Sequence, residues 1–287
     1  MSYWSRSESI RSRSSSVLKS STLTAILLFL VGLLGILSTA AFAQAASALL
    51  NEGIVSTSTN PTVEVSTNEL KAILAANSAR VFDARPTAEY AMSHIPGALN
   101  VAQKSGTPTS EYISDAAEIE RIVSGDKTAS IVLYCNGPFC GKTKRLASDL
   151  LAAGFTNVRR YQAGAPVWRA LVGTMQIEAS AVKNVWFNDM TARIYDARPV
   201  TGENRGANIP RSIVLPVNEV TTAKDDGRLP MEDHNTRIIC FGETGAQAKA
   251  LADEISKNAF HNVTFFNGAA EAFREAIFHE TGRAAGN

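Results

Sequence analysis

The stretch that decides the fold reads IVLYCNGPFCGKTKRLASDLLAAG and covers residues 131–154. Its first four residues are apolar or aromatic and lack a helical period, which is typical of a short strand buried on both faces. Further on, Leu146, Leu150 and Leu151 share one helical face, and Gly154 supplies a stop signal. The stretch therefore predicts a strand over residues 131–134, a tight loop and a helix over residues 143–153.

The loop between these elements has a thiol at its head and the composition of an anion-binding site. A loop from a parallel strand into a helix gathers backbone N–H groups, and the helix adds the positive end of its dipole. Such surroundings favour the thiolate, the nucleophilic form of cysteine. Gly137 and Gly141 let the backbone curl, and Lys142 begins a basic rim. We interpret Cys135 as a reactive thiol; the alternative is a small buried hydrophobic residue.

Two separate motifs carry a resemblance to a known family. The Cys135 loop with its flanking strand and helix resembles the active-site loop of the rhodanese (sulfurtransferase) family. Residues 81–101, VFDARPTAEYAMSHIPGALNV, resemble the family's second signature, Asp-x-Arg followed by Glu-Tyr and by His-Ile-Pro-Gly-Ala. The resemblance implies a sulfur-carrying Cys135. The residues expected to surround the substrate are Asn136, Gly137, Phe139, Cys140, Gly141 and Lys142.

This chain departs from the family pattern inside the loop. Many members have a basic residue five positions after the catalytic cysteine, where this chain has Cys140, and Pro138 lacks a backbone N–H. A curled loop could bring Cys135 and Cys140 to the Cα separation of about 5.5–6 Å that a disulfide needs. Cys140 could then resolve a Cys135 persulfide or shuttle electrons. The alternative is that Cys140 only packs the loop.

The sequence from residue 62 onward contains an internal repeat. The sequence Asp-Ala-Arg-Pro at residues 83–86 recurs at residues 196–199, and Cys135 recurs as Cys240. We expect an α/β fold with two tandem rhodanese-like domains, residues 62–178 and 179–287, each a mostly parallel sheet with helices on both faces. In such sheets ligands bind beyond the carboxyl ends of the strands, where Cys135 is expected.

The first domain is expected to be the active one and the second to be degenerate. Cys240 is a candidate secondary thiol, but Glu243 lies within its loop. A carboxylate there would disfavour a thiolate and repel an anionic substrate.

Other polar residues of the motifs are assigned structural roles. Asp83 and Arg85 can bond each other and the neighbouring loop backbone, so we interpret them as structural support. His94 lies in a Pro-Gly turn without an obvious partner and is also interpreted as structural. The four histidines show no metal-ligand spacing, and no Cys/His cluster indicates zinc, so neither a metal nor a cofactor is expected.

The N-terminus has the pattern of an export signal. A basic segment precedes the apolar residues 23–37, and Ala-Phe-Ala at residues 41–43 reads as a cleavage site. We expect a signal peptide over residues 1–43, a linker over 44–61 and a periplasmic or secreted protein; the alternative is an uncleaved membrane anchor that faces the periplasm. Cleavage removes four positive charges and one negative charge, so the formal net charge falls from +1 to −2. No nucleic-acid partner is expected, and a membrane contact only if the segment remains.

Three functions fit these residues. The first is a sulfurtransferase that moves sulfane sulfur from a small sulfur-containing anion or a persulfide, through a persulfide on Cys135, to cyanide or to a thiol acceptor, which could be a protein. The second is a thiol–disulfide redox protein that uses Cys135 and Cys140. The third is a non-catalytic binding module, because a fold alone does not define a function.

Overall fold

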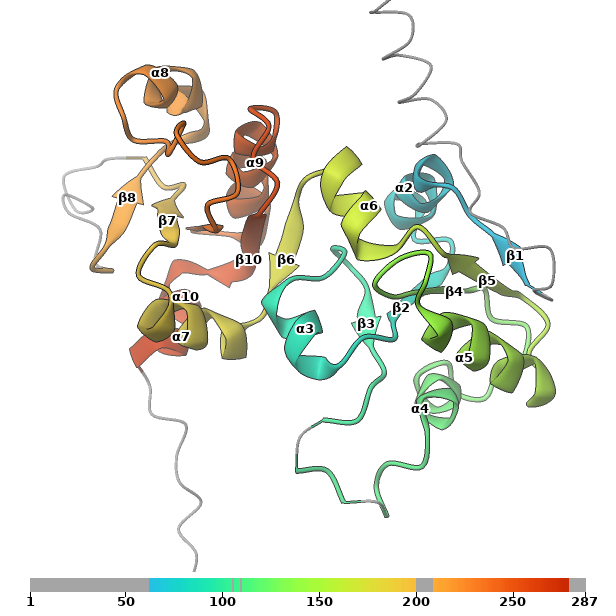
Figure 1. Ribbon diagram of the computed structural model, residues 1–287. Coiled ribbons are helices and arrows are strands. Elements are labelled where there is room, and N and C mark those ends of the chain that lie inside the picture. Colours follow the sequence, from blue (N-terminus) through green and yellow to red (C-terminus); the bar gives the residue numbers. More distant parts are fainter. Residues whose placement is uncertain (1–61, 105, 109, 200–208, 279–287) are drawn as a thin grey trace, which may run out of the picture. The chain divides into compact units, whose positions relative to one another are not determined.

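The computed structural model describes residues 62–104, 106–108, 110–199 and 209–278 (Figure 1). These residues belong to one compact unit, residues 51–287. They form two five-stranded parallel sheets flanked by helices, which is the predicted α/β class. The expected signal peptide and linker lie outside the described residues. None of the described helices is long and apolar enough to cross a membrane.

The first sheet has the strand order β1-β5-β4-β2-β3. Its central strand β4 is buried along its whole length, as the apolar run predicted. The parallel register pairs Tyr134 with Asp83 on one side and with Tyr161 on the other. Strands β2, β4 and β5 therefore end at one edge of the sheet. The bounds are Val63–Glu64 (β1), Arg80–Asp83 (β2), Leu99–Asn100 (β3), Ile131–Tyr134 (β4) and Val158–Tyr161 (β5).

Alternating side chains of β4 build the two layers of this core. Val132 and Tyr134 pack in a cluster that includes residues of α2 and α6. Ile131 and Leu133 pack in a second cluster with residues of α4 and α5. Burying each such side chain contributes about 1.5–3 kcal/mol. The helices are α2 (Thr67–Ala76), α3 (Thr87–Met92), α4 (Asp115–Ile122), α5 (Gly141–Ala152) and α6 (Gly164–Leu171).

Two helices differ from the sequence expectation. α5 begins at Gly141, two residues earlier than predicted, because the backbone of Cys140 is extended and serves as its N-cap. α3 was not predicted, because a helix of six residues after Pro86 shows too little periodicity to detect. The earlier start of α5 brings the positive end of its dipole next to Cys140.

The second sheet has the matching order β6-β10-β9-β7-β8. Its first strand, β6, pairs with β10 and covers Met175–Ile177. β6 thus belongs to the second sheet although it lies just before the predicted domain boundary at 178/179. The other elements are α7 (Ala179–Asn188), β7 (Arg193–Asp196), β8 (Ser212–Val214), η1 (Val217–Glu219), α8 (Val220–Asp225), β9 (Ile238–Gly242), α9 (Gly245–Ser256), β10 (Val263–Ala269) and α10 (Ala270–Phe278).

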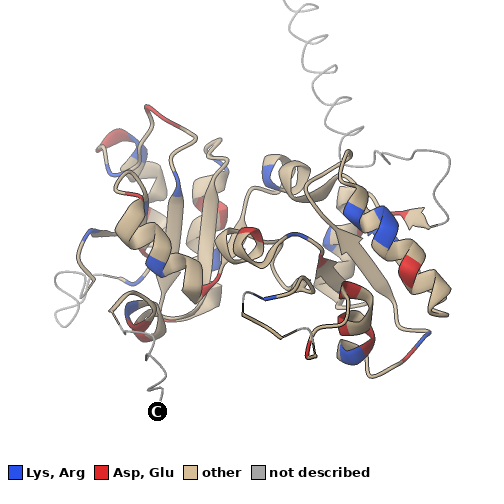
Figure 2. Cartoon of the chain, turned by 60° about the horizontal axis from the view of Figure 1, so that its bottom comes forward, with Lys and Arg blue, Asp and Glu red and all other residues tan. Residues whose placement is uncertain are grey.

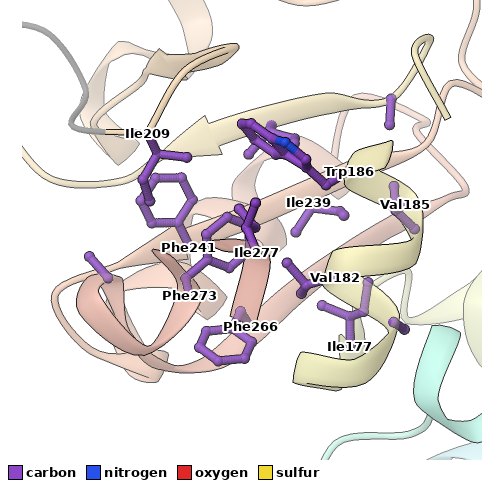
Figure 3. Packing of buried hydrophobic residues seen from close by; sticks show 14 of the residues in the cluster. Ile177, Val182, Val185, Trp186, Ile209, Ile239, Phe241, Phe266, Phe273 and Ile277 are labelled. Atoms are coloured by element: carbon purple, nitrogen blue, oxygen red, sulfur yellow. The ribbon is translucent and has the colours of Figure 1, made fainter. Parts of the chain in front are cut away.

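One core layer of the second repeat combines aliphatic side chains with packed aromatic rings (Figure 3). The rings of Phe241 and Phe273 stack with centroids 4.4 Å apart, and Phe266 meets Phe273 edge to face at 5.4 Å. Such ring pairs add about 0.5–1.5 kcal/mol each beyond the area they bury. The second sheet thus has a substantial core of its own against α7 and α10.

Candidate active site

Cys135 follows β4 directly and lies at the edge of the sheet where β2, β4 and β5 end. Cys135 is buried, with 4% of its surface accessible to solvent. Five residues later the chain enters α5, with Cys140 as the N-cap. This is the placement predicted from the sequence, a sulfur between a buried parallel strand and the positive end of a helix.

The sulfur of Cys135 is bonded to the sulfur of Cys140. Their Cα atoms are 6.3 Å apart, so the curled loop does bring the two thiols within bonding reach. The structure therefore describes the oxidised form of the site. Because a disulfide sulfur is not a thiolate, any nucleophilic chemistry of Cys135 requires prior reduction of this bond.

Gln162 holds the backbone of the loop. Its side-chain amide nitrogen donates to the carbonyl oxygens of Gly137 at 3.2 Å, Pro138 at 3.1 Å and Cys140 at 3.3 Å. The C=O and N–H of a trans peptide unit point in opposite directions. The N–H groups of Phe139 and Gly141, which follow two of these carbonyls, therefore point away from Gln162.

A buried polar network fixes Gln162 in turn. Its side-chain oxygen accepts hydrogen bonds from Arg160 at 2.6 Å and from the hydroxyl of Thr143 at 3.2 Å. Arg160 is fully buried and also donates to Thr62 and, at 3.2 Å, to Glu64. Burial lowers the pKa of Arg160, and the negative charge of Glu64 opposes that shift. The loop is thus braced from β5, the neighbouring strand.

Gln162 and Arg160 were not among the site residues expected from the sequence. Gln162 directly follows β5 and so lies at the same sheet edge as Cys135. The rule that drew attention to Cys135, that ligands bind beyond the carboxyl ends of parallel strands, could have found it.

Two glycines allow the start of α6 to touch the loop. The backbone N–H of Ala165 donates to the carbonyl of Cys135 at 2.9 Å. Gly164 has a φ of +70°, and a Cβ built on it would lie 2.5 Å from the oxygen of Cys135 and 2.7 Å from the Cα of Gly137. Gly137 itself has a φ of +101°. No other residue type fits at Gly164 without a backbone shift.

The remaining predicted substrate residues are spread around the loop. Asn136 is exposed and donates to Glu89 of α3 at 2.6 Å. The side chain of Phe139 is fully exposed. The ammonium of Lys142 donates to the carbonyl of Ala84, just beyond β2, at 3.2 Å. The structure thus brings Cys135, Gly137, Cys140 and Gly141 into one turn, with Lys142 close by.

Asp83 and Arg85 form a buried pair at the end of β2. Arg85 donates to both carboxylate oxygens of Asp83, the shortest bond being 2.6 Å, and to the carbonyl of Ser93 at 2.6 Å. Asn100 also donates to the backbone of both residues. These contacts hold the loops after β2 and β3 against each other, which is what a structural role requires.

His94 is a neutral, buried side chain. Burial lowers its pKa to about 4, outweighing the opposite effect of its bond to the carbonyl of Tyr90. Its ring stacks on Tyr90, and its backbone exchanges two hydrogen bonds with Gln176. Among the described residues, His94 makes no hydrogen bond or ring contact with Cys135. His94 therefore secures the chain where the two repeats meet.

Cys240, the candidate secondary thiol, is fully buried inside β9. β4 stops before Cys135, whereas β9 continues two residues beyond Cys240. Burial raises the pKa of the Cys240 thiol. The folded second repeat thus gives this thiol neither access nor thiolate character. Cys240 is the free cysteine that the odd cysteine count required.

The first repeat is similar in sequence to known proteins. The family described as Rhodanese-like domain matches residues 66–171. Human thiosulfate:glutathione sulfurtransferase is 33% identical over 113 residues, which cover 36% of this chain and 90% of that protein.

The chain belongs to the rhodanese-like sulfurtransferase family.

Solved structures that match about three quarters of this chain include three at low sequence identity. Wild-type EanB is 16% identical, with 76% of this chain and 61% of that chain covered and a TM-score of 0.35. Thiosulfate sulfurtransferase from Pseudomonas aeruginosa is 19% identical, with coverage of 73% and 41% and a TM-score of 0.31. SseA from Escherichia coli, a 3-mercaptopyruvate sulfotransferase, is 17% identical, with coverage of 72% and 98% and a TM-score of 0.30. This chain thus spans less than two thirds of the first two proteins.

Proposed function

We propose that the protein is an exported sulfurtransferase that carries sulfane sulfur as a persulfide on Cys135. One observation carries the proposal. Within the segment that matches the family, the Cys135 sulfur lies between the end of a buried parallel strand and the start of α5, in a loop braced by Gln162. A helix start and a gathered backbone favour negative charge there.

The reaction needs Cys135 in its reduced form. The Cys135 thiolate attacks the outer sulfur of thiosulfate or of a persulfide, and sulfite or a thiolate leaves. The protein persulfide then gives its outer sulfur to an acceptor thiol or to cyanide, which regenerates the thiolate. The loop N–H groups and the start of α5 stabilise the terminal sulfur while it is negatively charged.

The proposed sulfur donor is a small anion. Lys142 and Lys144, in the first turn of α5, supply a local positive field at the loop. Acidic and basic residues are mixed over both repeats in Figure 2, which supports local attraction rather than attraction by a whole face.

The second repeat is proposed to be a degenerate rhodanese-like domain. Its sheet order matches that of the first, but Cys240 lies inside a strand. Glu243 directly follows β9, and its carboxylate would repel an anionic substrate from this loop, so we assign this domain a structural role rather than sulfur transfer.

The proposed location is the periplasm or the exterior, after cleavage behind Ala43. An oxidising compartment fits a disulfide between two loop cysteines. The mass of the protein recovered from the producing cells tests the location, since cleavage leaves Gln44 as the first residue, whereas an anchor leaves the segment attached.

The observed disulfide favours a second candidate, a thiol–disulfide redox protein. Its cycle would use Cys135 and Cys140 without any sulfane sulfur. A substrate disulfide or dithiol would then exchange electrons with the loop.

Turnover assays separate the two candidates. Reduced protein is given thiosulfate or a thiol persulfide with an acceptor thiol, and sulfite or transferred sulfur is followed. We expect turnover in the wild type and in Cys240→Ala, and none in Cys135→Ser. Turnover that survives Cys135→Ser would overturn the proposal, as would an inactive wild type that still reduces disulfides.

A further inference from the structure

The two thiols of the loop differ in exposure although their sulfurs are bonded. Cys135 is buried, whereas Cys140 is partly exposed at the N-cap of α5. The Cys140 side chain makes no capping hydrogen bond, so its sulfur is not engaged by the helix start. A thiol at a helix N-terminus gains thiolate character from the dipole. Once the disulfide is reduced, the loop holds a second nucleophile beside the first.

The observed bond shows which atoms can meet. With the loop closed as described, the sulfur of Cys140 reaches the sulfur of Cys135 itself. That sulfur is the inner atom of a Cys135 persulfide. Gln162 holds the carbonyls of Gly137, Pro138 and Cys140 and so keeps the loop in this closed form.

We infer that Cys140 is a resolving thiol that releases the sulfur carried by Cys135 as hydrogen sulfide. The inference rests on the proposed function and assigns it a product. The Cys140 thiolate attacks the inner sulfur of the persulfide. The bond between the inner and outer sulfurs breaks, the outer sulfur leaves as hydrosulfide, and the Cys135–Cys140 disulfide forms.

The electrons balance with thiosulfate as donor. Thiosulfate and the two protein thiols give sulfite, hydrogen sulfide and the protein disulfide. The sulfane sulfur is reduced by two electrons, and the two cysteines are oxidised by two electrons. The disulfide in the structure is then the product of sulfur release.

A dithiol reductant must regenerate the site. Its thiolate attacks the sulfur of Cys140, which is the more exposed of the two cysteines, and Cys135 leaves as a thiolate. The second thiol of the reductant then releases Cys140 from the mixed disulfide. By this route one dithiol is consumed for each sulfide released, and the acceptor thiol or cyanide of the transfer route takes no part.

A single-turnover experiment tests this role. Wild type, Cys140→Ser and Cys240→Ala proteins are reduced with dithiothreitol, freed of it without air, and mixed with one equivalent of thiosulfate or of glutathione persulfide. Sulfide is measured, and intact masses are recorded. Cys240→Ala is the matched control, because Cys240 is the third cysteine and is buried away from the loop.

We expect the wild type and the control to release about one sulfide per chain and to lose about 2 Da relative to the reduced protein, as an internal disulfide forms. With thiosulfate as donor, Cys140→Ser should keep a gain of about 32 Da and release sulfide only after a thiol is added. Sulfide release from Cys140→Ser at the wild-type rate overturns the inference. A wild type that keeps the added sulfur while Cys140 stays open to alkylation overturns it as well.

The same experiment separates a failure of the proposed function from a failure of the resolving role alone. If Cys140→Ser gains no sulfur from either donor, Cys135 carries none, and both the function and the inference fall. If Cys140→Ser gains sulfur and the wild type behaves identically, only the resolving role falls.

Discussion

The contact between α6 and the Cys135 loop predicts a large effect of Gly164→Ala. The new Cβ would lie 2.5 Å from the oxygen of Cys135 and 2.7 Å from the Cα of Gly137, so one of the two backbone segments must move. Overpacking of this kind costs about 1–3 kcal/mol. The φ of +70° adds about 1–2 kcal/mol for a residue with a side chain. The sum is about 2–5 kcal/mol of stability.

Thermal unfolding and turnover measure this effect together. We expect the melting temperature to fall by roughly 5–15 °C. Turnover should fall as well, because the displaced atoms belong to Cys135 and Gly137. Gly154→Ala is the matched control: its φ is +90°, but no atom lies within 4 Å of the new Cβ. It should lose about 1–2 kcal/mol and keep its turnover. If Gly164→Ala equals Gly154→Ala in both measurements, the close approach of α6 to the loop is wrong.

Three further predictions follow from buried polar groups. Gln162→Glu keeps an acceptor for Arg160 but replaces the donor to three carbonyls with a carboxylate. Turnover of the reduced protein should drop about tenfold, or about 1.4 kcal/mol, and the melting temperature should fall as well, because buried carbonyl oxygens lose their donor. Asn267→Asp, 105 residues later at the corresponding position of the second repeat, should change neither, and equal turnover in both variants would contradict the bracing role. The pKa of His94 is lowered to about 4, so its contribution to the free energy of unfolding is complete above about pH 6.5 and is lost, by roughly 3 kcal/mol, as the pH falls toward 4. His94→Gln should therefore flatten the pH dependence of unfolding between about pH 6.5 and 4. An unchanged pH dependence in this variant would contradict the burial of a neutral His94. Cys240 should resist iodoacetamide in the reduced, folded protein and react only in urea, and rapid labelling in the native state would show that its burial is wrong.

The central β–loop–α unit was predictable because its signals are local. An apolar run, a glycine-containing loop and a leucine stripe lie next to one another in residues 131–154. They define β4 and the body of α5, and they place Cys135 between them. The spacing of Cys135 and Cys140 likewise indicated that a disulfide could form. The sequence left open whether it does, since that depends on how the loop closes.

The bracing of the loop was not predictable from local pattern. Gln162 and Arg160 read as ordinary polar residues near a strand, and only the pairing of β5 with β4 brings them to the loop. The sequence marks Gly164 only as the start of a helix, while its essential property is a close approach to the backbone of Gly137, 27 residues earlier in the chain. Strand β6 was not predicted for the same reason, because a strand of three residues is identified by its pairing with β10.

The most direct test of the account is to locate added sulfur among the three cysteines. Reduced Cys140→Ser protein, in which the persulfide cannot be resolved internally, is treated with thiosulfate or glutathione persulfide and mapped by peptide mass. We expect a gain of about 32 Da on the peptide that contains Cys135 and none on the peptide that contains Cys240. Sulfur on Cys240, or on neither peptide, would contradict it.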